Sequence, residues 1–404
     1  MGKIELLSPA GDMNKLKTAL YFGADAVYVG GKTLSLRALA GNFTEEEISE
    51  AVRYVHERNK KIYVTVNIFA KNSDVETAEK YFVFLQDSGV DGAIISDPGL
   101  VYSAKKVAPG LSVSLSTQAN TLNYRAAEFW KSQGVNRVIL ARELSFKEIK
   151  DIHEKVNGLE LEAFVHGAMC ISYSGRCLLS DYRSGRSSNR GECVQACRWN
   201  YEIREKNSDS GYMKVEEDGR GSYILNSKDL NLIEHIDGLA DSGVVSFKIE
   251  GRMKSEYYIA TVVNAYRRAL DAYYAKGAAY KNDPVFALEL KKTAHRDFTT
   301  AYCLGDNADT VNYSDSQSKG TYKFIATVLE KKDGYAVIEM RNRFRRGDML
   351  EVLSPSEEFN KTLKVDRLTD MNGNTVEDAR IVQQKLKLFT DLNLSAGDIL
   401  RAPQ

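Results

Sequence analysis

The sequence has no net charge, few cysteines and no long hydrophobic segment. Its 404 residues include 55 lysines and arginines and 55 aspartates and glutamates, so the formal net charge at pH 7 is zero. This excludes a polybasic protein that binds nucleic acid over its whole surface, and any such contact must come from a local patch. No apolar run approaches the roughly 20 residues that span a bilayer. The N-terminus also lacks the apolar core of a signal peptide. We therefore expect a cytoplasmic protein without a membrane contact.

Only five cysteines occur, and four of them lie close together. Cys170, Cys177, Cys193 and Cys197 have the spacing C-x6-C-x15-C-x3-C. In a reducing compartment such a group favours a metal centre over disulfides. Zinc and iron–sulfur clusters both take four thiolates, but zinc sites usually contain pairs separated by roughly two to four residues. Because only the last pair fits that rule, the spacing favours an iron–sulfur cluster and leaves zinc open. Cys303 stands apart and is expected to be an ordinary buried thiol.

Eight short apolar segments alternate with amphipathic ones over the first 250 residues. They are rich in β-branched residues and mostly lack clean alternation, as expected of parallel strands buried on both faces. Eight strand–helix units predict an α/β fold, a (β/α)8 barrel of the TIM type. An open doubly wound sheet is the alternative, but no G-x-G-x-x-G follows any strand. The predicted strands are residues 4–7, 26–29, 62–67, 93–96, 113–116, 137–140, 161–165 and 246–249.

The seventh unit carries an insertion, residues 168–222, that contains the four cysteines. Barrel enzymes build their sites from the loops after the strands, so the insertion is expected on the catalytic face. We expect the barrel domain to span residues 1–275, followed by a linker with a short helix at 276–319. Short strands separated by turn sequences then predict a small antiparallel β-barrel domain over residues 320–404.

Charged side chains appear where the predicted barrel strands end. The candidate catalytic residues at these positions are Arg142, Glu143, His166, Lys248, Glu250 and Arg252. Arg142 and Arg252 are candidates to bind a small dianion through bidentate contacts. His166, four residues before Cys170, is a candidate general acid or base, or a hydrogen-bond partner of the metal centre. The alternative is that these charged residues only form ion pairs that line the top of the barrel.

Arginines and aromatic residues are concentrated in the insertion and in the second domain. Such a mixture suits phosphate contact and base stacking on a single-stranded RNA loop, whereas a solvated basic face is the alternative. The residues concerned are Arg176, Arg183, Arg186, Arg190, Arg198 and Arg204 with Tyr173, Tyr182, Trp199 and Tyr201, and then Arg341, Arg343, Arg345 and Arg346.

The segments around the first two cysteines resemble the signature of the family filed as U32 peptidases. Residues 162–170 read EAFVHGAMC and residues 174–180 read SGRCLLS. Despite the family's name, the resemblance implies a [4Fe-4S] protein that supports oxygen-independent hydroxylation. The Cys-x3-Cys-Arg-Trp segment is similar to that of the tRNA hydroxylation subgroup. Further matching segments are residues 5–11, 189–193, 196–199, 226–230 and 248–254.

The resemblance implies a specific reaction. Proteins of this subgroup act on wobble uridine 34 and give 5-hydroxyuridine, with prephenate as the implied oxygen source. The partner would then be the tRNA anticodon loop, and a paralogue or a second copy of the chain is a further expected partner. Two rivals are a collagenase-like U32 peptidase and a non-catalytic RNA-binding subunit. Neither H-E-x-x-H nor G-x-S-x-G occurs in the sequence, which disfavours the peptidase.

Overall fold

The larger part of the protein is a closed barrel of parallel strands. The computed structural model describes residues 2–36, 41–170, 172–173, 176–199, 217–218, 221–222, 227–305, 310 and 318–404. The barrel strands pair in chain order, and the last one pairs with both the first and the seventh. They are β1 (Glu5–Pro9), β2 (Ala26–Gly30), β3 (Lys61–Val66), β4 (Gly92–Ile95), β5 (Val113–Leu115), β6 (Arg137–Ile139), β7 (Glu160–Ala168) and β11 (Ser246–Ile249). The predicted (β/α)8 barrel and its eight strands are therefore confirmed.

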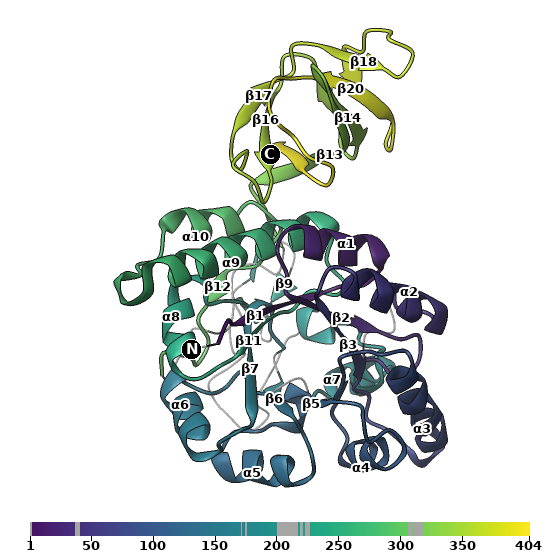
Figure 1. The fold of residues 1–404 in the computed structure, drawn as a ribbon, viewed down its shortest axis with the longest axis vertical. Helices are drawn as coiled ribbons and strands as arrows, with labels where there is room; N and C mark the ends of the chain where they lie inside the picture. Colours follow the sequence, from purple (N-terminus) through teal and green to yellow (C-terminus); the bar gives the residue numbers. More distant parts are fainter. Residues whose placement is uncertain are drawn as a thin grey trace.

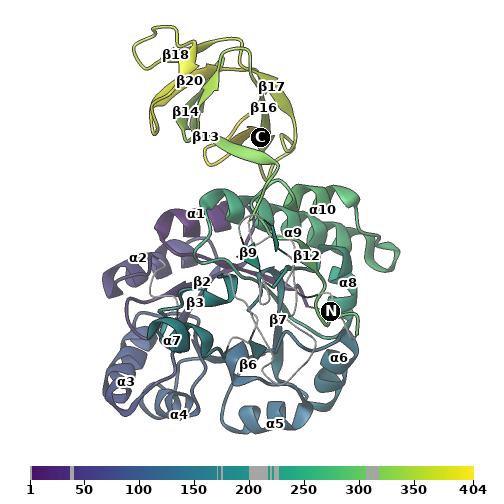
Figure 2. The same ribbon diagram turned by 180° about the vertical axis from the view of Figure 1, so that it is seen from behind.

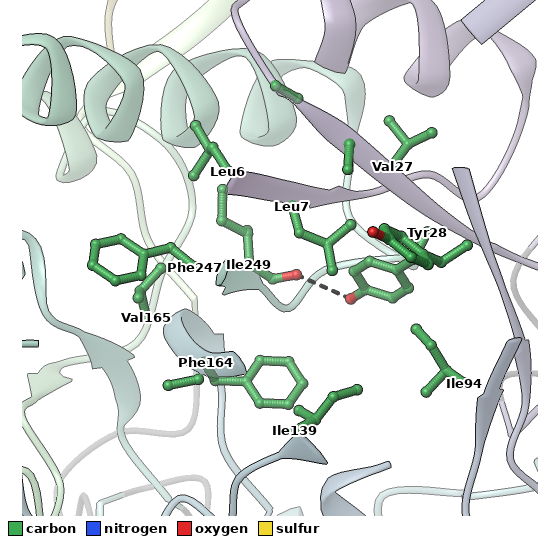
Figure 3. Packing of buried hydrophobic residues seen from close by; sticks show 14 of the residues in the cluster. Leu6, Leu7, Val27, Tyr28, Ile94, Ile139, Phe164, Val165, Phe247 and Ile249 are labelled. Carbon is green, nitrogen blue, oxygen red and sulfur yellow. Dashed lines mark hydrogen bonds between the residues drawn. The ribbon is translucent and has the colours of Figure 1, made fainter. Parts of the chain in front are cut away.

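The barrel strands are buried on both faces, which explains their continuous apolar sequences. Every residue of β2, Ala26–Gly30, is buried. Figure 3 shows Tyr28, Ile94, Ile139 and Phe164 pointing toward one another from different strands. The Tyr28 hydroxyl donates a hydrogen bond to the Ile249 carbonyl at 3.0 Å across the barrel sheet. The floor of the barrel's interior is therefore packed and not an open channel.

Helices form an outer ring around the barrel (Figure 1). Two of these helices begin with capping boxes, Thr44 with Glu47 and Ser145 with Glu148. The ring consists of α1 (Met13–Tyr21), α2 (Glu45–His56), α3 (Asn72–Asp87), α4 (Pro98–Val107), α5 (Tyr124–Ser132), α6 (Phe146–Lys155), α8 (Ile236–Asp241) and α9 (Glu256–Lys276). Within the described ranges, no helix combines the length and the apolarity needed to cross a membrane.

The seventh barrel strand continues beyond its predicted end and pairs with the chain that returns from the insertion. β10 (Asp229–Asn231) runs antiparallel to the end of β7, with Asp229 opposite Ala168. β12 (Phe298–Thr299) then pairs in parallel with β10. The sequence did not predict either short strand. The described part of the insertion contains α7 (Leu179–Ser184), two short 3-10 turns (Ser188–Arg190 and Ala196–Arg198) and the strand pair β8 (Glu217–Asp218) and β9 (Gly221–Ser222).

The second domain is an antiparallel half-barrel with its own core, as predicted for the C-terminal part of the chain (Figure 2). Its sheet has the order β17-β16-β21-β13-β14-β20-β18. The strands are β13 (Tyr322–Lys332), β14 (Tyr335–Met340), β16 (Met349–Leu353), β17 (Thr362–Lys364), β18 (Leu368–Asp370), β20 (Lys385–Phe389) and β21 (Ile399–Pro403). β15 (Phe344–Arg345) and β19 (Asp378–Ala379) form a separate two-stranded ribbon.

The second domain meets the barrel beside α9 and α10 (Pro284–Leu290) (Figure 1). A buried ionic contact joins the two domains. Arg401 of β21 and Glu289 of α10 are both fully buried and form a two-bonded ion pair. Arg401 also contacts Glu351 of β16 at 2.7 Å. Because these charges satisfy each other away from water, the junction has a defined geometry.

Candidate functional site

A cavity of about 450 Å³ lies at the carboxyl ends of the barrel strands. Strand ends and the loops that follow them form its inner wall, including Asn67, Gln118 and Ala168. The insertion contributes part of the wall through Ser180 and Gly191. The volume is within the range of roughly 300–1,000 Å³ that is common for small-molecule sites.

All four predicted metal-ligating cysteines line this one cavity: Cys170, Cys177, Cys193 and Cys197. Cys177 is buried, and its sulfur accepts a hydrogen bond from the Leu179 amide at 3.4 Å. The sulfur of Cys193 accepts one from the Gln195 amide at 3.3 Å. Amide donors two residues beyond a cysteine stabilise a thiolate, and hydrogen bonds to sulfur tune iron–sulfur centres.

The donor set and the shared cavity suit a four-thiolate centre. Among the residues that the structure describes, no three histidine, cysteine, aspartate or glutamate side chains are arranged as metal ligands. Cys303 does not line the cavity, and burial raises the pKa of its thiol to about 12.

Two arginines of the insertion hold it against the barrel. The guanidinium of Arg190 makes two bonds to the Asp74 carboxylate, at 2.9 and 3.2 Å, and its hydrogen bond keeps the pKa of Asp74 below the usual value. Arg176 Nε donates to the Gln118 carbonyl at 2.7 Å. These two residues, predicted to contact RNA, therefore fix the wall of the cavity. Arg204 and Tyr201 lie outside the described residues.

The guanidinium of Arg142 is held in place by its neighbours, and one of its N–H donors has no partner among the described residues. Its Nη1 donates to the Ala168 carbonyl at 3.0 Å, and its guanidinium lies 4.0 Å from the centre of the Phe164 ring. Its Nη2 is 4.0 Å from the carboxylate of Glu250, so their predicted ion pair is a loose one. Within the described part of the chain, the buried Nε of Arg142 has no hydrogen-bond partner. Both Arg142 and Glu250 line the cavity.

Arg252 also lines the cavity and is 3% exposed. Its guanidinium donates to the Ser35 hydroxyl at 2.9 Å and to the Thr65 hydroxyl at 3.2 Å. Gly30 makes room for it, because a Cβ at that position would lie 1.7 Å from the Arg252 Nη1. The sequence predicted that Arg252 lies at the barrel mouth, but not that its guanidinium occupies space left free by Gly30.

Lys248 also lines the cavity and pairs with Glu162 at 2.8 Å. Glu162 also contacts Arg137 at 3.0 Å, and Arg137 pairs in turn with Glu5 at 2.6 Å. Burial alone would raise the pKa of Glu162, but Lys248 and Arg137 outweigh that effect and lower it. The alternative that barrel charges form ion pairs thus holds for Lys248, although its partner is not one of the predicted strand-end acids.

Two predicted catalytic residues are not among the cavity's lining residues. His166 is 1% exposed and lies among the rings of Tyr258, Tyr266 and Phe298, with centroids 5.5 to 6.0 Å away. Burial lowers the pKa of His166 to about 3, so its imidazole is neutral at physiological pH. Glu143 is half-buried and is likewise absent from the lining. The structure therefore does not bring His166 or Glu143 together with the cysteines.

Sequence reasoning missed a buried ion pair in the cavity wall. Asp229 of β10 and Arg296 both line the cavity and are almost fully buried. Arg296 donates from Nε and Nη2 to Asp229 Oδ1, at 2.9 and 2.6 Å. Burial would raise the pKa of Asp229, but Arg296 outweighs it and lowers the pKa. Asp229 lies in the segment 226–230 that resembles the U32 family. Arg296 lies 67 residues later, and no motif around it indicates a role in the site.

Comparisons with family models and with related proteins agree on the family of this chain. The family model described as Peptidase family U32 matches residues 11–313, and the Peptidase family U32 C-terminal domain matches residues 320–401. The tRNA hydroxylation protein P1 of Bacillus subtilis is 41% identical, over 99% of this chain and 94% of its own length. The tRNA hydroxylation protein P of Escherichia coli is 37% identical, over 90% and 89% respectively. A Porphyromonas gingivalis protein named collagenase is 34% identical, over 74% and 73%. The chain therefore belongs to the peptidase family U32.

Proposed function

We propose that this protein is an RNA-modifying enzyme that hydroxylates wobble uridine 34 of tRNA to 5-hydroxyuridine without molecular oxygen. The observation that carries this proposal is the convergence of four cysteines and two arginines, Arg142 and Arg252, on one cavity at the barrel mouth. The names of the B. subtilis and E. coli relatives, which match almost the whole chain, support tRNA hydroxylation.

In this proposal the cysteines of the cavity hold a [4Fe-4S] cluster. Four thiols and two amide donors aimed at sulfur are a suitable donor set. When bound, such a cluster supplies electron-transfer chemistry that no side chain of the protein provides. The protein's own residues position it: Ser188 and Asn189 both donate to the Cys177 carbonyl, at 2.6 and 2.9 Å, and fix the loop that carries this thiol.

The arginines fit a small anionic cosubstrate, for which prephenate is the proposed identity. Arg142 offers the buried Nε donor, and Arg252 offers a guanidinium held by two hydroxyls. Carboxylates bind arginine through paired N–H donors. Phe164 and Tyr28 provide apolar wall beside these cations, which suits a molecule with both a ring and carboxylates.

The RNA base would enter from the open side of the cavity. Tyr173 and Trp199 of the insertion are 51% and 41% exposed. Exposed aromatic rings stack on unpaired bases, and a single-stranded loop can present one base to a pocket. The anticodon loop is such a substrate.

The rival peptidase function finds less support in the site. A cysteine peptidase needs a histidine base within hydrogen-bond reach of its thiol. His166, the histidine nearest in sequence to Cys170, is packed among aromatic rings and does not line the cavity. A non-catalytic RNA-binding subunit would not need cavity-facing cysteines. Partnership with a paralogue or a second copy remains a prediction.

Nucleoside mass spectrometry of tRNA from cells with and without the gene tests the substrate. We expect nucleosides derived from 5-hydroxyuridine to disappear in the deletion strain and to return with the wild-type gene. An unchanged nucleoside profile would reject the assignment. Anaerobic purification with iron and sulfide analysis tests the cofactor separately, and stoichiometric zinc without iron would overturn the cluster.

A further inference from the structure

The ribbon formed by β15 and β19 separates an apolar face from a charged one. Phe344 is opposite Ala379, and Arg345 is opposite Asp378. Phe344 and Ala379 are 2% and 0% exposed and belong to the core of the second domain. Because side chains alternate along a strand, Arg345 and Asp378 lie on the other face of the ribbon. The core thus fixes the position of the charged face.

Three arginines converge on the single carboxylate of Asp378. Arg343 makes two contacts, from Nε to Oδ1 at 2.9 Å and from Nη2 to Oδ2 at 2.6 Å. Arg380 Nη2 lies 2.7 Å and Arg345 Nε 3.2 Å from Oδ2. Hydrogen bonds from Arg343 and Arg380 hold the pKa of Asp378 well below its usual value. Three cations and one anion leave a charge of +2 in this arginine cluster (Arg343, Arg345, Arg380 and Asp378).

The guanidiniums of the arginine cluster remain accessible although they are oriented. The side chains of Arg343, Arg345 and Arg380 are 51%, 60% and 67% exposed, whereas that of Asp378 is 17% exposed. Each guanidinium has five N–H donors, more than one carboxylate can accept. Ile381 and Val382 follow directly and are 65% and 64% exposed. The surface therefore offers oriented cationic donors beside apolar side chains.

The arginine cluster follows closely in sequence on a contact between the second domain and the barrel. Arg341, two residues before Arg343, contacts Glu256 at 3.7 Å. Glu256 begins α9 just after β11, and Lys254, two residues earlier, lines the cavity. Two residues of extended chain span at most about 7 Å. The Arg341–Glu256 contact therefore connects the neighbourhood of the arginine cluster to the chain segment that lines the cavity.

We propose that the arginine cluster binds the phosphate backbone of the same RNA whose base enters the cavity. This inference rests on the proposed function, because it takes RNA as the substrate. Arginine pairs with phosphate through two parallel N–H···O bonds, and Asp378 keeps the three guanidiniums together before RNA arrives. The apolar Ile381 and Val382 suit contact with ribose or base. The buried Arg401–Glu289 pair joins the two domains that carry these contact points.

Binding of a labelled, unmodified tRNA transcript to the full-length protein, measured by fluorescence anisotropy at several salt concentrations, tests the proposal. Arg343→Gln with Arg380→Gln should weaken binding by about tenfold at low salt and reduce the salt slope by about one to two. Asp378→Asn should strengthen binding several-fold, because the loss of the competing anion outweighs the looser placement of the guanidiniums. Lys323→Gln with Lys332→Gln removes two exposed cations of β13 and should change binding much less.

A purely structural ion-pair cluster predicts no gain in RNA affinity for Asp378→Asn. In that case thermal stability would fall and RNA affinity would not rise, which overturns the proposal. Tighter binding of Asp378→Asn to polyglutamate but not to tRNA would assign the surface to an acidic protein and overturn it too. If wild type binds and modifies tRNA but the arginine variants bind equally well, this surface is wrong and the proposed function stands. If wild type does not bind tRNA, the proposed function itself fails.

Discussion

Lys248 and Glu162 form an ion pair in the interior of the barrel, with the Nζ 2.8 Å from the Oε1 and with side chains that are 4% and 1% exposed. Lys248 faces the cavity, and Glu162 links it to Arg137 below. The floor of the candidate site is thus a charged layer whose members satisfy one another. Such a layer fixes the positions of its side chains. Removing any one of them leaves its partner as an uncompensated buried charge.

Lys248→Met should destabilise the protein by about 3–5 kcal/mol. The buried Glu162 carboxylate would then keep only Arg137 as a cationic partner, and it shares Arg137 with Glu5. Urea unfolding measures this change. The double variant Lys248→Met with Glu162→Leu should recover much of the loss, since no buried charge is left without its partner. Lys155→Met removes an exposed pair with Asp151 and should leave stability unchanged. A Lys248→Met protein as stable as wild type would contradict this account.

His166 should make stability depend on pH in the mildly acidic range. Burial lowers its pKa to about 3, whereas in the unfolded chain it titrates near about 6.5. Below that value the unfolded state binds a proton that the folded state does not, so stability falls as pH falls, by up to about 1.4 kcal/mol per pH unit. At pH 5 the accumulated loss from this residue is about 2 kcal/mol.

His166→Phe should remove this contribution to the slope. Unfolding free energies of the two proteins, measured from pH 7 to 5, should therefore converge or cross as pH falls. Parallel curves would mean that His166 keeps a normal affinity for protons in the folded protein.

Cys193→Ala should abolish iron and sulfide incorporation under anaerobic reconstitution, because a four-thiolate centre loses a ligand. Cys303→Ala is the matched control, since this thiol is buried, has a raised pKa and lies outside the cavity lining. Metal and acid-labile sulfide analysis should show a loss only for Cys193→Ala. Equal cofactor content in the two variants would remove Cys193 from the ligand set.

Gly30→Ala should impair the site while leaving the cysteines able to bind their cofactor. The added Cβ would lie 1.7 Å from Arg252 Nη1 and 2.7 Å from Ser35 Oγ, so the guanidinium must leave its seat. We expect tRNA hydroxylation in cells to fall at least tenfold, a change of about 1.4 kcal/mol in the barrier, with iron content unchanged. Gly2→Ala, where a Cβ meets no atom within 4 Å and the backbone does not have a positive φ, controls for general effects of a glycine substitution. Normal hydroxylation by Gly30→Ala would show that the position of Arg252 is unimportant.

Periodicity predicted the barrel because each strand and helix is a local pattern. The seat of Arg252 and the pairing of Asp229 with Arg296 could not be predicted, since each joins residues that are far apart in the chain. The placement of His166 failed for a different reason. β7 carries an irregularity in its pairing with β11 near His166, which changes the face on which later side chains lie. A strand-end position alone therefore did not determine whether His166 faced the cavity.

The short strands β10 and β12 also restrict how the protein can be divided. Asp229 lies in β10, and Arg296, its partner in the cavity wall, immediately precedes the segment that forms β12. Cutting the chain after α9 would separate the two charges and expose the edge of β10. A barrel fragment intended for study, or a chimera that exchanges the second domain with a relative, should therefore retain the chain through residue 299.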